Sequence, residues 1–468
     1  MAPCYNPKKL YMKVFFRCVQ VVLVVAIILS AAFGLASLSA LHKANQVLCK
    51  NCNVILISID TLGAKHTSVY DPTLDTTPYL KQLADSRGVV FDHAYDQAPW
   101  TLPSHTSMFT GEYPWTFGIW TLSDKLPDSA YTVFEAARDR GYKTAGFSDG
   151  SFVQPINGLT QGIDDFSGSF QESDWNDLPV LFVKAAKWIT EYHEPKPFFL
   201  LLRPFEVHDP YGEPGTAGAV TIEDIVAANT KPGGPTADDI RTFEAAYHQE
   251  IRITDSALKD FMTSFDASPY AKNTVIIITA DHGEEFGEHG TVAAHGITTY
   301  NEVIHVPLIF IIPGVAPRRV VQTVELRSIP ATIMDIIGYG KNNPFQASSL
   351  VPMLIGDPAP NQLVLTRTAS SKSTVFQNVI AGYAEIANWG VTVFPTPRIG
   401  TYDGPYTSSA LRGQWHVIRD RDGSLEVYDL SNDPDEKKNL YPTVASLPFD
   451  AQQTIKELIL VLNPLPTQ

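Results

Sequence analysis

Cysteine is scarce in this chain: only four of the 468 residues are cysteines, and Cys4 and Cys18 precede or border a hydrophobic segment near the N-terminus. Four cysteines so placed exclude a disulfide-stabilised scaffold. Cys49 and Cys52 lack a second pair or nearby histidines, so they do not form a zinc-binding motif. A local disulfide between Cys49 and Cys52, or two free thiols, are the remaining alternatives.

Positive charge is also in short supply. Lys and Arg number 35 against 50 Asp and Glu, which gives a formal net charge of −15. This balance disfavours a broad electrostatic contact with nucleic acid or anionic lipid, so we expect no nucleic acid as a structural partner. An anionic substrate would therefore need a local binding group, such as a metal ion. Internal repeats and low-complexity tracts are absent from the sequence as well.

One long uncharged run is present, at Val19–Leu41, directly after a basic segment. It exceeds the roughly 7 to 15 residues of a signal-peptide core and reaches the roughly 20 that span a bilayer. We predict a cytoplasmic N-terminus at residues 1–18 and a transmembrane anchor at residues 19–41. The positive-inside rule then places the catalytic domain outside the cytoplasm, in the periplasm or the extracellular space. A cleaved signal segment is the alternative, because Ser37 and Ser39 loosely fit the small-residue cleavage pattern.

Apolar runs of strand length alternate with segments of helical periodicity over residues 50–345. This alternation predicts an α/β sandwich, in which a mostly parallel central sheet is flanked by helices. We take this stretch as the catalytic domain. The predicted strands are Val54–Ile59, Phe198–Leu202, Val275–Thr279 and Val306–Ile312, and the predicted helices are Pro78–Ser86, Thr132–Arg140, Pro179–His193 and Asp238–Phe265.

The pattern changes in the last third of the chain. Trp415–Asp420 and Leu425–Leu430 flank an Asp-Gly turn, which predicts an antiparallel hairpin. We therefore place a small C-terminal subdomain at residues 346–468, closed by an apolar helix at Ala451–Leu462.

Within the catalytic domain, Pro210–Pro235 is rich in Pro, Gly and Thr. This composition predicts a long loop, either a lid over a site or a plain surface insertion.

Acidic and imidazole side chains follow two of the predicted strands. Asp60 comes directly after Val54–Ile59, and Asp281 with His282 follows Val275–Thr279 after one residue. A single Asp in such a place is more often a helix cap. Because the carboxyl ends of parallel strands meet at one edge of a sheet, the three side chains together predict a divalent metal site. Two carboxylates and an imidazole favour zinc or manganese over calcium, as one or two ions.

A glycine-rich loop after Asp281 carries His289 and His295. A loop that bends freely can return imidazoles to a metal site, although each histidine alone is more often a surface or core residue.

A hydroxyl group stands at a candidate helix start. Pro103 suits the first turn of a short helix and Gly111 its end, which places Thr101 just before the amino end. Free backbone N–H groups and the helix dipole stabilise an anion there. A hydroxyl is a weak nucleophile until a metal lowers its pKa, so the alternative to a nucleophile is an ordinary Thr cap.

These residues lie in motifs that resemble the sulfatase family of the alkaline-phosphatase superfamily. The segments "ILISIDTL", "PWTLPSHTSMFTGEYP", "HDPY", "DHGEEFGEHG" and "HVPLIF" occur in the family's order. Near the end, "LRGQWHVI" and "VYDLSNDPDEKKNL" are similar to the family's C-terminal hairpin and turn. The resemblance covers residues 52 to 442.

The resemblance implies specific roles. Four residues match positions that hold the catalytic metal: Asp60, Thr101, Asp281 and His282. Thr101 also matches the nucleophile. Two residues match positions that bind the anionic group of the substrate, protonate its leaving group or hold a second metal: His208 and His295. Two further histidines are candidates for substrate binding: His105 and His289.

The chain also departs from the family pattern. Sulfatases proper carry a Cys or Ser, followed by x-Pro-x-Arg, that is oxidised to formylglycine. Here Thr101 stands at that position and His105 at the Arg position, and Thr cannot yield the aldehyde. Thr61 replaces the usual second acid beside Asp60, and His282 replaces the Asn of calcium-type sulfatases. These changes resemble relatives with a Thr nucleophile, such as nucleotide pyrophosphatases, phosphoethanolamine transferases and lipoteichoic acid synthases, which act on phosphoesters.

We therefore expect an extracytoplasmic metallohydrolase that cleaves an anionic ester, namely a phosphate monoester or diester, by attack of Thr101. Hydrolysis of sulfate esters is one alternative, and phosphotransfer onto envelope lipids or polymers is another. A non-catalytic binding protein on the same scaffold is the alternative outside enzymology. The sequence does not indicate the organic part of the substrate or the oligomeric state.

Overall fold

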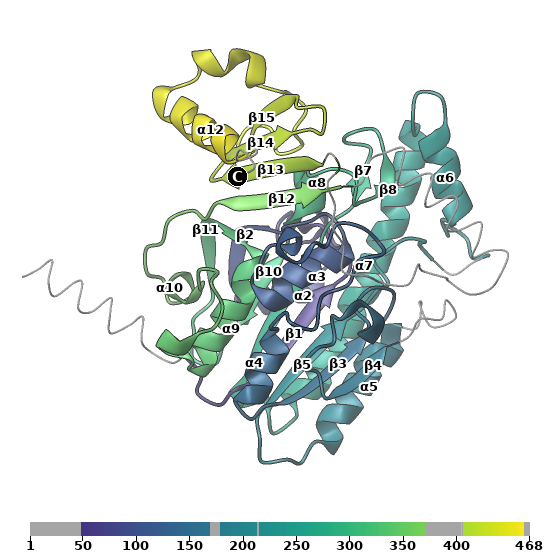
Figure 1. Ribbon diagram of the computed structural model, residues 1–468. Helices are drawn as coiled ribbons and strands as arrows, with labels where there is room; N and C mark the ends of the chain where they lie inside the picture. The colour runs from purple at the N-terminus through teal and green to yellow at the C-terminus, as the bar shows by residue number, and fades with distance from the viewer. Residues whose placement is uncertain (1–47, 169–177, 213–214, 370–403, 405, 463–468) are drawn as a thin grey trace, which may run out of the picture. The chain divides into compact units, whose positions relative to one another are not determined.

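The computed structural model describes residues 48–168, 178–212, 215–369, 404 and 406–462 (Figure 1). The predicted cytoplasmic segment and transmembrane anchor lie outside these residues. Among the helices that are described, none combines the length and the apolar character needed to cross a bilayer. The described residues from Leu48 onwards form one compact unit.

A nine-stranded mixed sheet forms the centre of this unit. Its strand order is β11-β2-β10-β6-β1-β5-β3-β4, and β9 pairs with β2. Neighbouring strands run parallel except β10, which is antiparallel to β2 and β6, and β9. The strands are β1 (Asn53–Ile59), β2 (Val89–Tyr95), β3 (Lys143–Ser148), β4 (Asp165–Gly168), β5 (Phe198–Arg203), β6 (Thr274–Ala280), β9 (His305–Val306), β10 (Leu308–Ile311) and β11 (Arg318–Glu325).

The predicted strands are present, with one change. Every residue of β1, β5 and β6 is buried, which explains their continuous apolar sequences. The predicted strand Val306–Ile312 is instead divided into β9 and β10 at Pro307. Proline has no N–H to donate to a ladder, so the chain leaves the strand there.

The helices named below pack against one another in two groups. One group contains α2, α5 and α7, and the other contains α3, α4 and α9. The predicted helices are confirmed to within about two residues, which is the usual uncertainty of helix ends. The bounds are α2 (Pro78–Arg87), α3 (Thr101–Thr110), α4 (Val133–Asp139), α5 (Leu178–Glu191), α7 (Ala237–Asp266) and α9 (Ile329–Ile337).

The prediction of a continuous loop over Pro210–Pro235 was wrong in part. Helix α6 (Ile222–Thr230) occupies its middle. The Thr221 hydroxyl accepts the N–H of Asp224 and the Asp224 carboxylate accepts the N–H of Thr221, a capping box that starts the helix. This local cap compensates for the weak helical periodicity of the segment.

The predicted C-terminal hairpin is confirmed as part of a four-stranded antiparallel sheet, in the order β12-β13-β14-β15. The predicted final helix is α12 (Phe449–Leu462), which packs on β13 and β14 around a hydrophobic core of their own. Further elements are β12 (Val364–Thr368), β13 (Thr407–Arg412), β14 (Trp415–Arg419), β15 (Leu425–Asp429), α8 (Asn301–Ile304), α10 (Val351–Leu354) and the two-stranded ribbon β7 (Glu285–Phe286) and β8 (Val292–Ala294).

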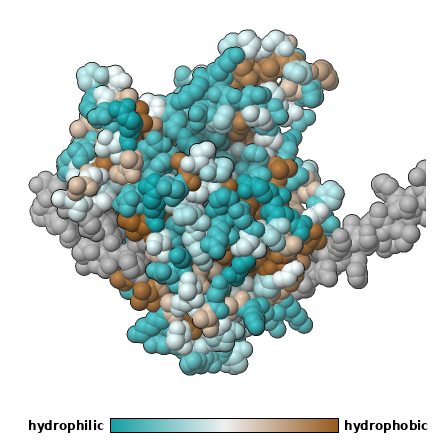
Figure 2. Space-filling view, turned by 180° about the vertical axis from the view of Figure 1, so that it is seen from behind, coloured by the Kyte–Doolittle hydropathy of each residue, from teal (hydrophilic) through white to brown (hydrophobic). Residues whose placement is uncertain are grey.

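The face of the molecule opposite to that of Figure 1 is mainly hydrophilic (Figure 2). On the side opposite to that of Figure 1, hydrophobic residues occur in small groups among hydrophilic ones (Figure 2). Helix α12 contributes exposed apolar side chains, including Phe449 and Leu460. Scattered exposed hydrophobic residues are normal for a folded domain.

Candidate metal centre and active site

Four strand-end loops bring polar side chains to one edge of the central sheet. Asp60 follows β1, Asp281 and His282 follow β6, and His208 lies in the loop after β5. These three strands are parallel neighbours, so their carboxyl ends lie together. Strand β2 points the same way as β6, because β10 is antiparallel to both, and it leads into α3, which begins at Thr101.

The four side chains expected to hold a metal lie close together. The Thr101 hydroxyl oxygen is 3.4 Å from Nε2 of His282. The same nitrogen is 3.5 Å from Oδ1 of Asp60 and 3.7 Å from Oδ2 of Asp281. One donor atom from each of Asp60, Asp281 and His282 lies within 4.8 Å of the others, and all three residues are buried.

The chemistry of this centre fits a divalent cation. Among the described residues, Oδ1 of Asp60 and Oδ2 of Asp281 are buried without a hydrogen-bond partner. Nδ1 of His282 lies 3.0 Å from the Gly283 carbonyl and donates its N–H there, so the Nε2 lone pair faces the two carboxylates. Burial and the nearby His295 hold the pKa of His282 well below its ordinary value, so the ring is neutral. One such carboxylate oxygen on each acid and a neutral imidazole are groups that zinc or manganese would satisfy.

Arg203 is a site residue that the sequence analysis missed. Its side chain is fully buried at the end of β5, where the guanidinium forms an ion pair with Oδ2 of Asp60 and donates to the Asp149 carbonyl. The pair holds one oxygen of Asp60 and leaves the other for a metal. A signal was present, because Arg203 ends the apolar run "FFLLLR" just as Asp60 follows its own strand.

Asp281 is fixed by backbone donors. Its Oδ1 accepts the N–H of Thr61 at 3.2 Å and that of His282 at 3.1 Å. Thr61 has a positive φ of 52°, a conformation that is strained for a β-branched residue. The strained residue directs its N–H towards the carboxylate, which leaves Oδ2 of Asp281 for the metal centre.

His105, expected to bind substrate, lies beneath the centre. It is fully buried, with Nε2 3.1 Å from the Ser58 hydroxyl and Nδ1 3.0 Å from the Thr101 carbonyl. Nδ1 is also 3.4 Å from Oδ2 of Asp281, and burial lowers the pKa of the ring. Both ring nitrogens face protein groups, a position suited to orienting Thr101 and Asp281.

His208 and His295 do lie at the centre. The rings of His208 and His295 are 4.8 Å apart between centroids, and His295 is 4.5 Å from His282. Burial lowers the pKa of His208, but Asp209, whose carboxylate lies 3.1 Å from Nδ1, outweighs it and raises the pKa to about 10. The pKa of His295 is likewise raised, against the effect of burial, by Glu284 at 3.0 Å. Both rings are therefore suited to donate protons.

His289 lies elsewhere. Its Nδ1 is 2.6 Å from Oε1 of Glu302, and its Nε2 is 3.2 Å from the Glu436 carbonyl. The ring also stacks on Tyr300. These contacts join His289 to the segment that follows β15, rather than to the strand-end residues.

A sequence profile of the sulfatase family matches residues 52–339, more than half of the chain. The chain belongs to the sulfatase family. Arylsulfatase K of Rattus norvegicus is 21% identical to this sulfatase-family hydrolase over 500 residues, covering 94% of this chain and 83% of that protein. The Delta 4,5-hexuronate-2-O-sulfatase of Bacteroides thetaiotaomicron is 23% identical, covering 87% of each.

Solved structures share the sulfatase-family fold. A 2-O GAG sulfatase superposes with a TM-score of 0.66 at 19% identity, covering 88% of this chain and 92% of that one. The phosphonate monoester hydrolase of Agrobacterium radiobacter superposes with a TM-score of 0.64 at 19% identity, covering 88% and 95%. The α/β sandwich with its C-terminal antiparallel sheet is thus the sulfatase fold.

Proposed function

We propose that this sulfatase-family hydrolase cleaves phosphate esters, diesters included, by attack of Thr101 on phosphorus. The observation that carries the proposal is the Thr101 hydroxyl, 3.4 Å from His282, beside two carboxylate oxygens that lack partners. Thr101 is also the first residue of α3, and the helix has no side-chain cap, so the N–H groups of Thr101 and Leu102 can bind an anion.

The reaction divides into two displacements. Thr101 Oγ1, whose hydroxyl proton passes to solvent, forms a bond to phosphorus as the bond to the leaving oxygen breaks, and His208 or His295 gives that oxygen a proton. Water then displaces Thr101 from the phosphothreonine: its oxygen bonds to phosphorus, one of its protons returns to the histidine, and the released Thr101 oxygen takes up a proton from solvent. A divalent cation held by Asp60, Asp281 and His282 would lower the pKa of the Thr101 hydroxyl and offset charge on the phosphoryl oxygens.

Sulfate-ester hydrolysis is the second candidate, because the curated relatives are named as sulfatases. Against it stands Thr101, which cannot be oxidised to formylglycine. A solved structure with this fold is named as a phosphonate monoester hydrolase, so the fold also hosts hydrolysis at phosphorus. Hydrolysis of a phosphate ester is consistent with both the threonine at position 101 and the fold.

The site is proposed to lie outside the cytoplasm. The uncharged run at Val19–Leu41 supports a membrane anchor. Cys49 and Cys52, just after it, form a disulfide, which suits an oxidising compartment.

A transferase that passes the phosphoryl-linked group from Thr101 to an envelope lipid or polymer is a variant of the same chemistry, in which an alcohol replaces water in the second displacement.

A substrate panel tests the proposal. With zinc or manganese added, we expect kcat/KM on nitrophenyl phosphate or bis-nitrophenyl phosphate to exceed that on nitrophenyl sulfate by at least about 100-fold, a preference within reach of one active site. Metal content is measured on the same samples. A higher kcat/KM on the sulfate would overturn the phosphate assignment and favour the second candidate.

Replacing His208 is expected to slow turnover of esters with poor leaving groups. His208→Ala should lower kcat by about 100-fold or more on an alkyl phosphate, but by about 10-fold or less on a nitrophenyl phosphate, whose leaving group needs no proton. His193→Ala, which removes an exposed histidine, is the matched control. Equal losses on both esters would show that His208 is no proton donor, and His295→Ala would then be tested in the same way.

A further inference from the structure

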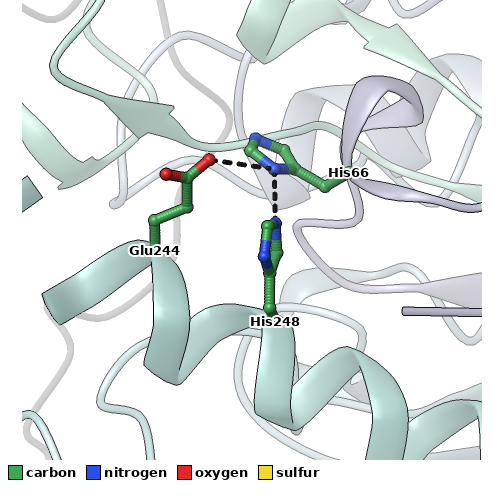
Figure 3. Close-up of side chains that lie close together, drawn as sticks. All are labelled: His66, Glu244 and His248. Atoms are coloured by element: carbon green, nitrogen blue, oxygen red, sulfur yellow. Dashed lines mark hydrogen bonds and ion pairs between the residues drawn. The ribbon is translucent and has the colours of Figure 1, made fainter. Parts of the chain in front are cut away.

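We propose that His66, Glu244 and His248 form a second divalent-cation site, separate from the strand-end centre. The short helix η1 (Ala64–His66) supplies His66, and α7 supplies Glu244 and His248, four residues apart on one helical face (Figure 3). Donor atoms of the three residues lie within 4.8 Å of one another. This proposal does not depend on the proposed function.

The spacing of the donor atoms suits a metal. Nδ1 of His66 is 3.0 Å from Nε2 of His248 and 3.8 Å from Oε1 of Glu244. Ligand atoms bound to tetrahedral zinc at 2.0–2.1 Å lie about 3.3 Å from one another, between these two separations. Two histidines and one carboxylate leave a fourth position for water, an arrangement typical of zinc.

A hydrogen bond between the two histidines accounts for only part of the arrangement. Two neutral rings share a single proton at the 3.0 Å contact, and Glu244 at 3.8 Å is too far away to accept one from His66. Nε2 of His66 is buried without a hydrogen-bond partner, against the rings of Tyr247 and Phe286. A proton on that Nε2 leaves the Nδ1 lone pair facing His248 and Glu244, where a cation would satisfy all three groups.

The protonation states favour metal binding. Burial, then Lys65 and His248, hold the pKa of His66 well below its ordinary value. Burial and Arg252 lower the pKa of His248 to about 4. Both rings are therefore neutral near pH 7, the form that binds metals. Burial raises the pKa of Glu244, Lys65 lowers it and Glu288 raises it, with a net upward shift.

Neighbouring cations do not block the site, because each is paired. Lys65 forms an ion pair with Glu288, and Arg252 lies 2.8 Å from Asp75. The remaining charge at the cluster is the carboxylate of Glu244. A site with one negative charge and two neutral imidazoles attracts a divalent transition metal.

An ion here would tie α7 to the loop that follows Asp60. Tyr247, beside His248 on α7, donates its hydroxyl proton to the Thr61 carbonyl and accepts the N–H of Gly63. The His66 ring packs edge-on against the Tyr247 ring. The second ion would thus stabilise the backbone that carries Asp60 into the active site, which gives it a positioning role.

Metal content of the purified full chain tests this site. After equilibration with zinc and dialysis, wild-type protein should retain about two ions per chain and His248→Ala about one, with His193→Ala unchanged as the matched control. In an Asp281→Asn background, which removes a ligand of the strand-end centre, the remaining ion should be lost when His248→Ala is added. Zinc should raise the Tm of wild-type protein by about 3 °C or more beyond that of His248→Ala.

Equal zinc content in wild-type and His248→Ala protein, at comparable circular dichroism, would overturn the second site. The pair would then be a histidine hydrogen bond alone. Glu244→Gln repeats the comparison at a more exposed position, in case His248→Ala fails to fold. None of these measurements depends on enzyme activity. Failure of the proposed phosphate-ester hydrolysis and failure of this metal site would therefore be detected separately.

Discussion

Thr101→Ala is expected to abolish turnover, with a fall in kcat of at least about 1,000-fold, while the protein stays folded and keeps its metal. The substitution removes the only atom of Thr101 that can bond to phosphorus. Asp60, Asp281 and His282 remain to hold the cation, and the substitution removes only one hydroxyl and one methyl group, so little packing is lost. Thr101→Ser restores the hydroxyl and should restore most of the activity.

Ser107→Ala is the matched control, because it removes a buried hydroxyl from the same helix. It should leave kcat within a few fold of wild type. Single-turnover labelling with a radioactive phosphodiester provides the second measurement: label should remain on the wild-type and Thr101→Ser proteins after denaturation, and not on Thr101→Ala. Full phosphodiesterase activity in Thr101→Ala would rule out this nucleophile.

Arg203→Met should cause the largest loss of stability at the site, about 3 to 5 kcal/mol in the free energy of unfolding. Arg203 and Asp60 are both fully buried, so removing the guanidinium leaves the Asp60 carboxylate without its protein partner. A bound divalent cation compensates in part. The loss should therefore be larger in EDTA than in zinc, because chelation removes the second positive charge beside Asp60.

Denaturant unfolding in zinc and in EDTA measures both effects. Arg87→Met is the control, since Arg87 pairs with Asp266 at 2.8 Å but both side chains are more than one-third exposed. Such exposed pairs contribute about 1 kcal/mol or less. If Arg203→Met lost no more stability than Arg87→Met, or lost the same amount in zinc and in EDTA, the coupling between Arg203 and the metal centre would be wrong.

The sequence predicted that the candidate metal ligands lie together, because their positions depend on a simple rule. Each acid follows an apolar run of strand length, and parallel strands end at one edge of a sheet, so Asp60 and Asp281 converge without any knowledge of long-range contacts. The direction of β10 could not be predicted in this way. Every residue of β10 is buried, and a strand buried on both faces is a continuous apolar run in either direction. Only Pro307 signalled that the run was divided.

Side-chain partners over long sequence separations could not be predicted either. Arg203 contacts Asp60 across 143 residues and His66 contacts His248 across 182, and no spacing rule links such pairs. The burial of His105 could not be predicted. Its position in the motif predicted a contact with substrate, whereas the fold places it behind Thr101, against β1. Burial of this kind follows from packing, which the sequence pattern leaves open.

The C-terminal sheet limits how far the chain can be shortened. The hydroxyl of Thr366 donates to the Asp96 carbonyl and that of Thr368 to the Gly296 carbonyl, five residues before Thr101 and one after His295. A chain cut at residue 339, where the family profile stops, would leave both carbonyls without these donors. The smallest fragment that keeps the backbone around Thr101 intact must therefore include β12 and the strands that hold β12 in place.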